Sequence, residues 1–160
     1  MEWRNLRKSK LEMSREETIE TLRNNTEGIL ATLNPDGSPH AIPMNYAYAD
    51  NQIIMHCAKT GHKIDNIKQN NKVCFTVVGG YDLDKSGRAA SGWNIYYRCV
   101  DIFGKATFIE EGTYELLEKF IAPFVKDLPD VPKMDPNAVR GTAVIVIDIE
   151  HMTGKKNWGD

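Results

Sequence analysis

Apolar and polar positions alternate along much of this chain with the two-residue period of β-strands. Six stretches carry a strand pattern, at residues 28–33, 39–49, 53–57, 73–78, 94–109 and 143–149. The second stretch has bulky side chains at every other position, namely Ile42, Met44, Tyr46 and Tyr48. This spacing predicts one buried and one exposed face, because successive side chains of a strand point to opposite sides. The last stretch begins with a continuous apolar run, which predicts burial on both faces.

Turn residues separate the first three strand patterns. Residues 34–37 (NPDG) place proline at the second position of a tight turn, and residues 50–51 (DN) mark the next reversal. Three strands joined by such short turns are expected to form an antiparallel meander. Further along, residues 79–92 are rich in glycine, serine and charge and predict a long excursion. Gly104 predicts a bulge or bend inside the longest strand.

Three helices are expected between the strands. Ser14 and Glu17 form a capping-box pattern, which predicts a short amphipathic helix ending near Asn24. A second helix is expected to begin near Gly61. Thr113 is expected to cap a third, whose apolar residues follow a 3.6-residue period: Leu116, Leu117, Phe120, Ile121 and Phe124. Prolines at 129, 132 and 136 then predict a break in regular structure.

The order of these elements favours one mainly β domain over residues 1–160. Six antiparallel strands with inserted helices are typical of a closed or split β-barrel. A length of 160 residues and a hydrophobic fraction of 41% suit a single globular domain. Residues 1–12 are polar and basic and are expected to form an N-terminal arm.

Charge and hydropathy narrow the classes of partner. The net charge is −2, from 20 lysines and arginines against 22 aspartates and glutamates, so the sequence lacks the concentrated basic face typical of nucleic-acid binding. No apolar run approaches the ~20 residues of a membrane span, and the N-terminus lacks the apolar core of a signal peptide. The sequence therefore favours a cytoplasmic protein that binds neither membrane nor nucleic acid.

The three cysteines do not form a metal or redox motif. Cys57, Cys74 and Cys99 are widely spaced, and no C-x-x-C pair occurs. Cys57 and Cys74 lie within apolar strand patterns, where a free cysteine usually packs as a small hydrophobic residue. Packing is therefore expected for both, and no metal site is predicted.

Residues 53–70 contain the candidate anion site. A strand runs into the sequence Lys59-Thr60-Gly61-His62-Lys63, which opens a helix. A helix N-terminus carries unpaired N–H groups and about half a positive charge, so it binds anions well. The spacing is that of neither a P-loop nor a dinucleotide-binding glycine motif. The sequence therefore predicts a phosphate site of another kind, with a solvated lysine-bearing helix start as the alternative.

A flat ring could lie beside this site. The small residues Asn45 and Ala47 would leave the backbone of their strand accessible to a planar heterocycle, and several aromatic residues are available: Tyr46, Tyr48, Trp93, Tyr96, Tyr97 and Trp158. A phosphate joined to a planar ring describes flavin mononucleotide (FMN) or pyridoxal phosphate. The second would need a lysine for a Schiff base, and no single lysine stands out for that role.

Four blocks of sequence carry a family resemblance. GILATLNPDGSPHAIPMNYAY, IIMHCAKTGHKIDNI, YYRCVDIFGKA and IEHMTGK resemble successive blocks of the 5-nitroimidazole resistance (Nim) family, within the FMN-binding split-barrel group related to pyridoxamine 5′-phosphate oxidase. The resemblance covers residues 28–155, and the H-x-A-x-x-G-x-K block at 56–63 is its most specific part. It implies a six-stranded split barrel that forms a homodimer, with two flavins in clefts between the subunits.

The resemblance also implies which residues contact the flavin. The ring would lie along Met44, Asn45, Tyr46 and Ala47 and then His56, Cys57 and Ala58. Its phosphate would be held by Thr60, Gly61, His62 and Lys63, with His62 also near the substrate as a candidate proton donor. The partner subunit would contribute Tyr97, Arg98 and Cys99 and the tail residues Lys155 and Trp158.

The sequence departs from its relatives at the substrate end. Pyridoxamine phosphate oxidases end in an arginine and histidine substrate clamp, whereas this chain has only Arg140 after Arg98. Cys99 replaces an expected serine, and the 79–92 excursion is long. These departures argue against the pyridoxamine phosphate oxidase reaction and indicate a different pocket rim. The resemblance to the Nim family implies an FMN-dependent oxidoreductase of the nitroreductase type. A flavin-binding or sensing module without turnover, and an oxidase-like enzyme with another substrate, are the alternatives.

Overall fold

The computed structural model describes residues 3, 6–87 and 89–157. Seven strands form one sheet: β1 Glu27–Leu33, β2 Pro39–Asn45, β3 Ala47–Ala49, β4 Gln52–Cys57, β5 Lys72–Asp84, β6 Asn94–Ile109 and β7 Ala143–Asn157. Four α-helices accompany it: α1 Arg15–Arg23, α2 His62–Gln69, α3 Tyr114–Val125 and α4 Pro136–Gly141. Short 3₁₀ turns lie at Ser9–Leu11 and Ala90–Gly92.

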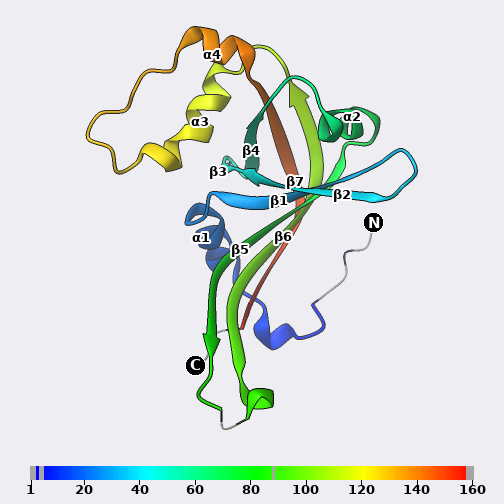
Figure 1. Ribbon diagram of the computed structural model, residues 1–160, viewed down its shortest axis with the longest axis vertical. Coiled ribbons are helices and arrows are strands. Elements are labelled where there is room, and N and C mark those ends of the chain that lie inside the picture. Colours follow the sequence, from blue (N-terminus) through cyan, green and yellow to red (C-terminus); the bar gives the residue numbers. More distant parts are fainter. Residues whose placement is uncertain (1–2, 4–5, 88, 158–160) are drawn as a thin grey trace.

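The sheet wraps into a split barrel. Its strand order is β2-β1-β5-β6-β7-β4-β3, and every pairing is antiparallel. The two edge strands, β2 and β3, are consecutive in the chain and are separated only by Tyr46, so the chain bends there from one edge to the other (Figure 1). The prediction of a mainly β split barrel is confirmed, although the sheet has seven strands rather than six. The expected strand 39–49 is divided because the Tyr46 side chain turns into the core.

The expected three-stranded meander is confirmed in its two antiparallel pairings, but its middle strand is divided. β1 pairs with β2 and β3 pairs with β4, as the two turns require, but β1 continues to β5 and β4 continues to β7. Short turns specify hairpins only, whereas the bend at Tyr46 sends the two hairpins to opposite ends of the sheet.

The core fills the barrel and is closed at one end by α1. Residues of β1, β4, β5, β6 and β7 that face inward are fully buried, including Leu30, Ile53, Phe75, Ile102 and Ile145. The Tyr46 hydroxyl donates to the Leu22 carbonyl of α1 at 2.9 Å, and burial raises the pKa of this phenol. Helix α1 itself begins with the predicted capping box of Ser14 and Glu17 and ends at Asn24, so this prediction is confirmed.

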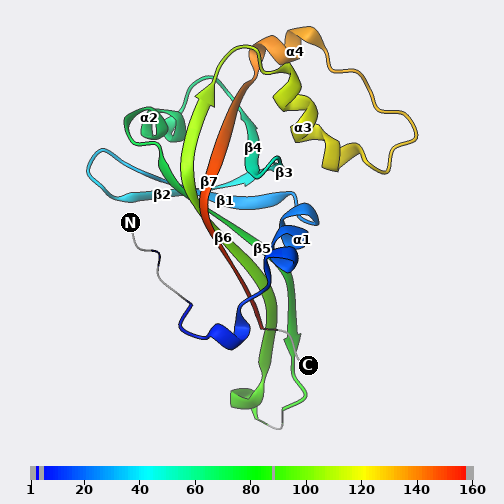
Figure 2. The ribbon, with the colours of Figure 1, turned by 180° about the vertical axis from the view of Figure 1, so that it is seen from behind.

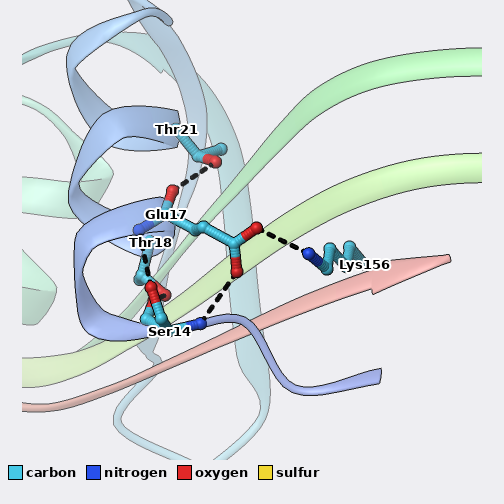
Figure 3. Close-up of polar contacts among 5 residues, drawn as sticks. All are labelled: Ser14, Glu17, Thr18, Thr21 and Lys156. Carbon is cyan, nitrogen blue, oxygen red and sulfur yellow. Dashed lines mark hydrogen bonds and ion pairs between the residues drawn. The ribbon is translucent and has the colours of Figure 1, made fainter. Parts of the chain in front are cut away.

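The capping box also ties α1 to the last strand (Figure 3). One Glu17 oxygen accepts from the Ser14 N–H at 3.0 Å, while the other accepts from the Lys156 ammonium at 2.5 Å. A Cβ at Gly154 would overlap Thr18, so the helix can approach β7 closely only because this residue is glycine. The predicted tail after residue 149 is therefore a continuation of β7, held by α1.

The expected 79–92 excursion is mostly a two-stranded ribbon. β5 extends to Asp84 and pairs with Asn94 onward, with a bulge between Gly79 and Tyr81, so among the described residues only 85–87 and 89–93 lie outside the two strands. The ribbon projects beyond the barrel in both views (Figures 1 and 2). The sequence pattern did not predict a strand at residues 79–84, which are rich in glycine and charge. A ribbon that covers no core does not need the usual alternation of apolar and polar residues.

Gly104 confirms the predicted bulge. The register of β6 against β7 shifts between Phe103 and Gly104, and a Cβ at Gly104 would collide with the Asp148 backbone carbonyl. The bulge increases the local bend that closes the barrel.

Helices α3 and α4 cover a second apolar cluster on the outside of β4 and β7. Ile54, Val144 and Val146 are buried there beneath Leu117. Thr113 occupies the N-cap position of α3 as predicted, but its hydroxyl donates to the Thr142 carbonyl rather than capping the helix. Pro136 does not break structure: it begins α4, whose N-cap Asp135 accepts from the Asn137 N–H at 2.9 Å. Within the described residues, no helix has the length and apolar character needed to cross a membrane.

Candidate active site

The junction of β4 and α2 has an open helix N-terminus. Gly61 is the N-cap of α2, and no side chain caps the helix there. Its φ of +135° is one that residues with a side chain rarely adopt, and nothing lies within 4 Å of the position a Cβ would occupy. The amides of Ile64 and Asp65 both donate to the Gly61 carbonyl, at 2.8 and 3.1 Å. The first turn of α2 therefore faces free space at its positive end.

Polar and cationic side chains surround this end of the helix. Thr60 and His62 are exposed, and Lys63 is half-buried. The Lys63 charge lies close enough to β4 to add to the burial that lowers the pKa of His56 and to oppose the burial that raises the pKa of Cys57. Ile64 and Ile67 are buried on the opposite side of the helix and fix its orientation. A ligand anion at Gly61 would thus meet a helix dipole, a hydroxyl and an ammonium.

His62 joins a hydrogen-bonded network that ties α2 to the β1–β2 turn. Asn34 donates its amide N–H to the Ser38 hydroxyl, so its Oδ1 is the acceptor for both the Asn66 amide at 2.9 Å and His62 Nε2 at 2.7 Å. The buried Asn66 also donates to the Thr32 hydroxyl at 3.0 Å. The bond to Asn34 requires the proton on Nε2, which leaves Nδ1 of a neutral His62 as an acceptor.

The His40 ring lies against His62, with 4.2 Å between the ring centroids. His40 Nδ1 is buried and has no hydrogen-bond partner within the described chain. The structure therefore gives His62 two neighbours from the β1–β2 hairpin that its position in the sequence did not reveal.

His56 has an aromatic neighbour that the sequence patterns did not identify. The Phe120 ring of α3 lies 4.6 Å from the His56 ring, and Phe124 continues the row at 5.1 Å from Phe120. The 3.6-residue period of the sequence predicts only that both phenylalanines pack on the apolar face of a helix. Only the pairing of β4 with β7, which brings α3 over β4, places them beside the candidate site.

A pH titration tests the environment of His56. Burial, followed by the Lys63 charge, lowers the pKa of His56 from 6.5, so the unfolded chain binds this proton more readily than the folded one. The free energy of unfolding is then expected to fall as the pH drops through about 6.5, and His56→Gln should reduce that slope. Imidazole resonances followed by NMR should give a midpoint for His56 below 6.5, and a midpoint at or above that value would contradict the assignment.

The predicted ring-binding segment lies at the bend between the two edge strands. Met44 and Asn45 end β2, Tyr46 is buried in the core, and Ala47 begins β3 opposite Ile54 of β4. The Tyr46 amide is already occupied by the Thr26 carbonyl at 2.9 Å. The segment runs beside β4, so it and His56, Cys57 and Ala58 can form one wall.

The residues predicted from the partner subunit lie together, but far from this wall. Tyr97, Arg98 and Cys99 pair with Asn157, Lys156 and Lys155 in the β6–β7 ladder. His56 pairs with Val144, and Lys155 follows eleven residues later on the same strand, about 35 Å of extended chain. Trp158 lies outside the described residues.

The cysteines behave as packing residues. Cys57 is buried, Cys74 and Cys99 are half-buried, and burial is the main cause that raises the pKa of all three thiols. A raised pKa disfavours the thiolate that nucleophilic or metal-binding chemistry requires. No cluster of metal-ligating side chains occurs in the described part of the chain.

The arrangement at β4 and α2 fits a flavin phosphate. The glycine at the N-cap lets a ligand approach the backbone, and the neighbouring Thr60 and Lys63 offer a hydroxyl donor and a charge. The adjacent wall of main chain and small side chains suits a planar ring.

Comparisons with solved structures show the same fold. One neighbour is a candidate 5-nitroimidazole antibiotic resistance protein from Bacteroides thetaiotaomicron, with a TM-score of 0.76 and 22% identity over 91% of this chain and 86% of that chain. Another is the flavocytochrome Anf3 from Azotobacter vinelandii, with a TM-score of 0.80 and 19% identity over 97% of this chain and 73% of that chain. A third is an FAD and heme binding protein from Mycobacterium smegmatis, with a TM-score of 0.80 and 16% identity over 94% of this chain and 76% of that chain.

The family comparison is more specific than these fold likenesses. No curated protein matches the sequence. The family model for pyridoxamine 5′-phosphate oxidase matches residues 14–156, which include α1, the candidate site and all seven strands except the last residue of β7. The chain therefore belongs to the pyridoxamine 5′-phosphate oxidase family of flavin-binding split barrels.

Proposed function

We propose that this protein is an FMN-dependent oxidoreductase of the nitroreductase type, related to the nitroimidazole resistance proteins. The observation that carries the proposal is the uncapped α2 N-terminus at Gly61, with Thr60 and Lys63 beside it. This corner supplies a dipole, a hydroxyl and an ammonium to one phosphate. A single phosphate and a flat ring correspond to FMN, and the neighbour from Bacteroides thetaiotaomicron supports the choice of a nitroimidazole as the first acceptor to test.

The residues of the chain bind and orient the cofactor. Lys63 and Thr60 would hold the phosphate, and the main chain of Met44–Ala47 and His56–Ala58 would lie along the ring. Bound flavin would accept electrons from a donor and pass them to the acceptor. Phe120 lies next to His56 with Phe124 beside it, and the two rings give the acceptor side of the wall an aromatic surface.

His62 is proposed as the proton donor to the reduced acceptor. Its Nε2 donates to Asn34, and this bond fixes the ring and its tautomer. Nδ1 is then the ring nitrogen left to transfer a proton to the acceptor.

The active form is proposed to be a homodimer. The two groups of predicted flavin contacts lie at distant points of β7, so one chain cannot bring both to one ligand. A second copy, turned around a twofold axis, could place its Tyr97, Arg98, Cys99 and Lys155 against the first copy's α2.

Exposed apolar side chains on one side of the sheet support this dimer. The outward side chains of β1, β5 and β6 form the dimer face: Ile29, Leu33, Val78, Tyr81, Leu83 and Ile95, with exposed fractions from 37% to 68%. The bulge between Gly79 and Tyr81 keeps the ribbon residues on the same side as Val78. Exposed apolar patches of this kind mark protein interfaces.

Absorption spectroscopy followed by reoxidation tests the proposal. We expect purified protein mixed with FMN and desalted to keep a flavin spectrum, and its reduced form to be reoxidised by a nitroimidazole under anaerobic conditions. A deazaflavin spectrum of the isolated protein would replace FMN with another cofactor, as in the neighbour that is an F420 reductase. Retained flavin that neither nitroimidazoles nor quinones reoxidise would instead favour the sensing module.

A further inference from the structure

The N-terminal arm forms a basic pocket with the ends of β6 and β7. The pocket has a volume of about 360 Å³ and is lined by residues from both parts of the chain: Leu6, Arg7, Lys8, Leu11, Tyr97, Lys155 and Asn157. Volumes of this order hold nucleotide-sized ligands. The proposed phosphate site at Thr60, Gly61 and Lys63 is called the phosphate corner. The pocket lies at the far end of β7 from the residues that pair with β4, so within one chain it is separate from the phosphate corner.

The arm is fixed to the barrel just beside this pocket. Met13 donates its N–H to the Gly154 carbonyl at 2.9 Å, and Glu12 forms an isolated antiparallel bridge with Lys155. The 3₁₀ turn at Ser9–Leu11 then reverses the arm, and Leu11 donates to the Lys8 carbonyl at 3.0 Å. These contacts bring Lys8 and Arg7 to the edge of β7.

Three cations meet in the pocket, and none of the described residues that line it carries a carboxylate. No ion pair of Arg7, Lys8 or Lys155 occurs in residues 3, 6–87 and 89–157, where the four salt bridges all involve other residues. The Lys155 ammonium lies 5.4 Å from the Tyr97 ring centroid. A hydrogen bond to Tyr97 raises the pKa of Lys155, whereas the charge of Arg7 opposes this rise. Like charges held together from two segments favour an anion between them.

The remaining walls define the kind of anion. Leu6 and Leu11 are half-buried and give the pocket an apolar side, and Asn157 donates its amide to the Ile95 carbonyl at 2.6 Å, so it is held in place. A bare inorganic ion would use only the cationic side. An anion that also carries an apolar ring would use both.

We propose that this pocket binds the diphosphate and adenosine portion of a dinucleotide. Arg7, Lys8 and Lys155 pair with the phosphates, and Leu6 and Leu11 contact the adenosine. Two dinucleotides share this chemistry: flavin adenine dinucleotide, and the nicotinamide dinucleotide that would donate electrons. Tyr97 and Lys155 of this pocket are also proposed to reach the flavin of the partner subunit, so the use of the pocket in catalysis rests on the proposed function, whereas ADP binding is measured without FMN.

Calorimetry with ADP as the probe tests the pocket directly. ADP is expected to bind the wild-type protein, and adenosine, which lacks the phosphates, to bind at least tenfold more weakly. Arg7→Gln should weaken ADP binding at least tenfold. Lys10→Gln is the matched control, because Lys10 is an exposed lysine of the same arm that does not line the pocket. Raising the salt concentration should weaken ADP binding to the wild type more than to Arg7→Gln.

Two further titrations identify the source of the diphosphate. If it belongs to the cofactor, FAD should bind the wild type more tightly than FMN does, and Arg7→Gln should abolish the difference. If it belongs to the donor, Arg7→Gln should weaken NADH binding while FAD and FMN keep equal affinities. Either result supports the pocket.

The inference would be overturned if ADP at millimolar concentration did not bind the wild type. It would also be overturned if Arg7→Gln and Lys10→Gln lost the same amount of ADP affinity. FMN titration separates this failure from that of the proposed function. FMN retained without ADP binding leaves the phosphate corner intact and removes only the basic pocket. ADP binding without FMN binding would do the reverse.

Discussion

Replacing both Ile29 and Val78 by aspartate should convert the protein to a monomer that has lost flavin. The two side chains are 47% and 56% exposed and lie near one another on neighbouring strands of the dimer face. In the dimer each carboxylate would be buried without a partner, at a cost of roughly 2 kcal/mol or more. Together they should raise the dimer dissociation constant at least a hundredfold, since each 1.4 kcal/mol is about a factor of ten. Light scattering and the flavin-to-protein ratio after desalting measure the two effects.

A matched variant distinguishes the dimer face from exposed apolar surface in general. Leu128 and Val131 lie between α3 and α4 and are 49% and 57% exposed. Aspartate at both positions adds the same charge outside the dimer face, so this variant should remain a dimer and keep its flavin. A monomeric wild type with full flavin, or a dimeric Ile29 and Val78 variant, would contradict the homodimer proposal. The thermal transition of each variant verifies that the barrel is folded.

Lys63→Ala should weaken FMN binding at least tenfold. The ammonium beside the open α2 N-terminus would make a charge-assisted contact with the phosphate, worth roughly 1.5–3 kcal/mol. Lys68→Ala is the control on the same helix: Lys68 is exposed and pairs with Glu110 at 3.7 Å, a surface contact of little energetic value. Quenching of flavin fluorescence gives both affinities. Riboflavin, which has no phosphate, should bind Lys63→Ala and the wild type equally.

The same variant has a second readout that needs no flavin. Because the Lys63 charge contributes to the low pKa of His56, the His56 midpoint in an NMR titration should rise in Lys63→Ala. An unchanged FMN affinity together with a raised His56 midpoint would mean that Lys63 stands at the site but does not contact the phosphate. Such a result would refute the phosphate assignment without questioning the structure.

Local patterns predicted most of the elements correctly. The capping box of Ser14 and Glu17, the buried start of β7, the bulge at Gly104 and the start of α2 at Gly61 each depend on a few adjacent residues. Such signals act over one turn or one strand, and they persist whatever surrounds them. The junction proposed to bind the phosphate could be predicted from the sequence for the same reason, because β4 leads directly into α2.

Contacts between distant segments could not be read in this way. The Tyr46 side chain fits the alternation of a single strand, yet its bond to Leu22 in α1 divides the strand and sends β2 and β3 to opposite edges. His56 and Phe120 meet only because β4 pairs with β7 beneath α3. Residues 79–84 appear as a loop in sequence, and pairing with β6 makes them a strand.

The sequence alone determined a mainly β chain, a strand-to-helix junction at Gly61 and the family resemblance. The tertiary structure decided how the strands close, which aromatic rings line His56, that the basic arm reaches Lys155, and that the two groups of proposed flavin contacts lie too far apart for one chain. The physical reason is the separation along the chain over which each interaction acts. Backbone propensity, capping and side-chain alternation act between near neighbours, whereas barrel closure, the basic pocket and the dimer face depend on which distant surfaces are buried together.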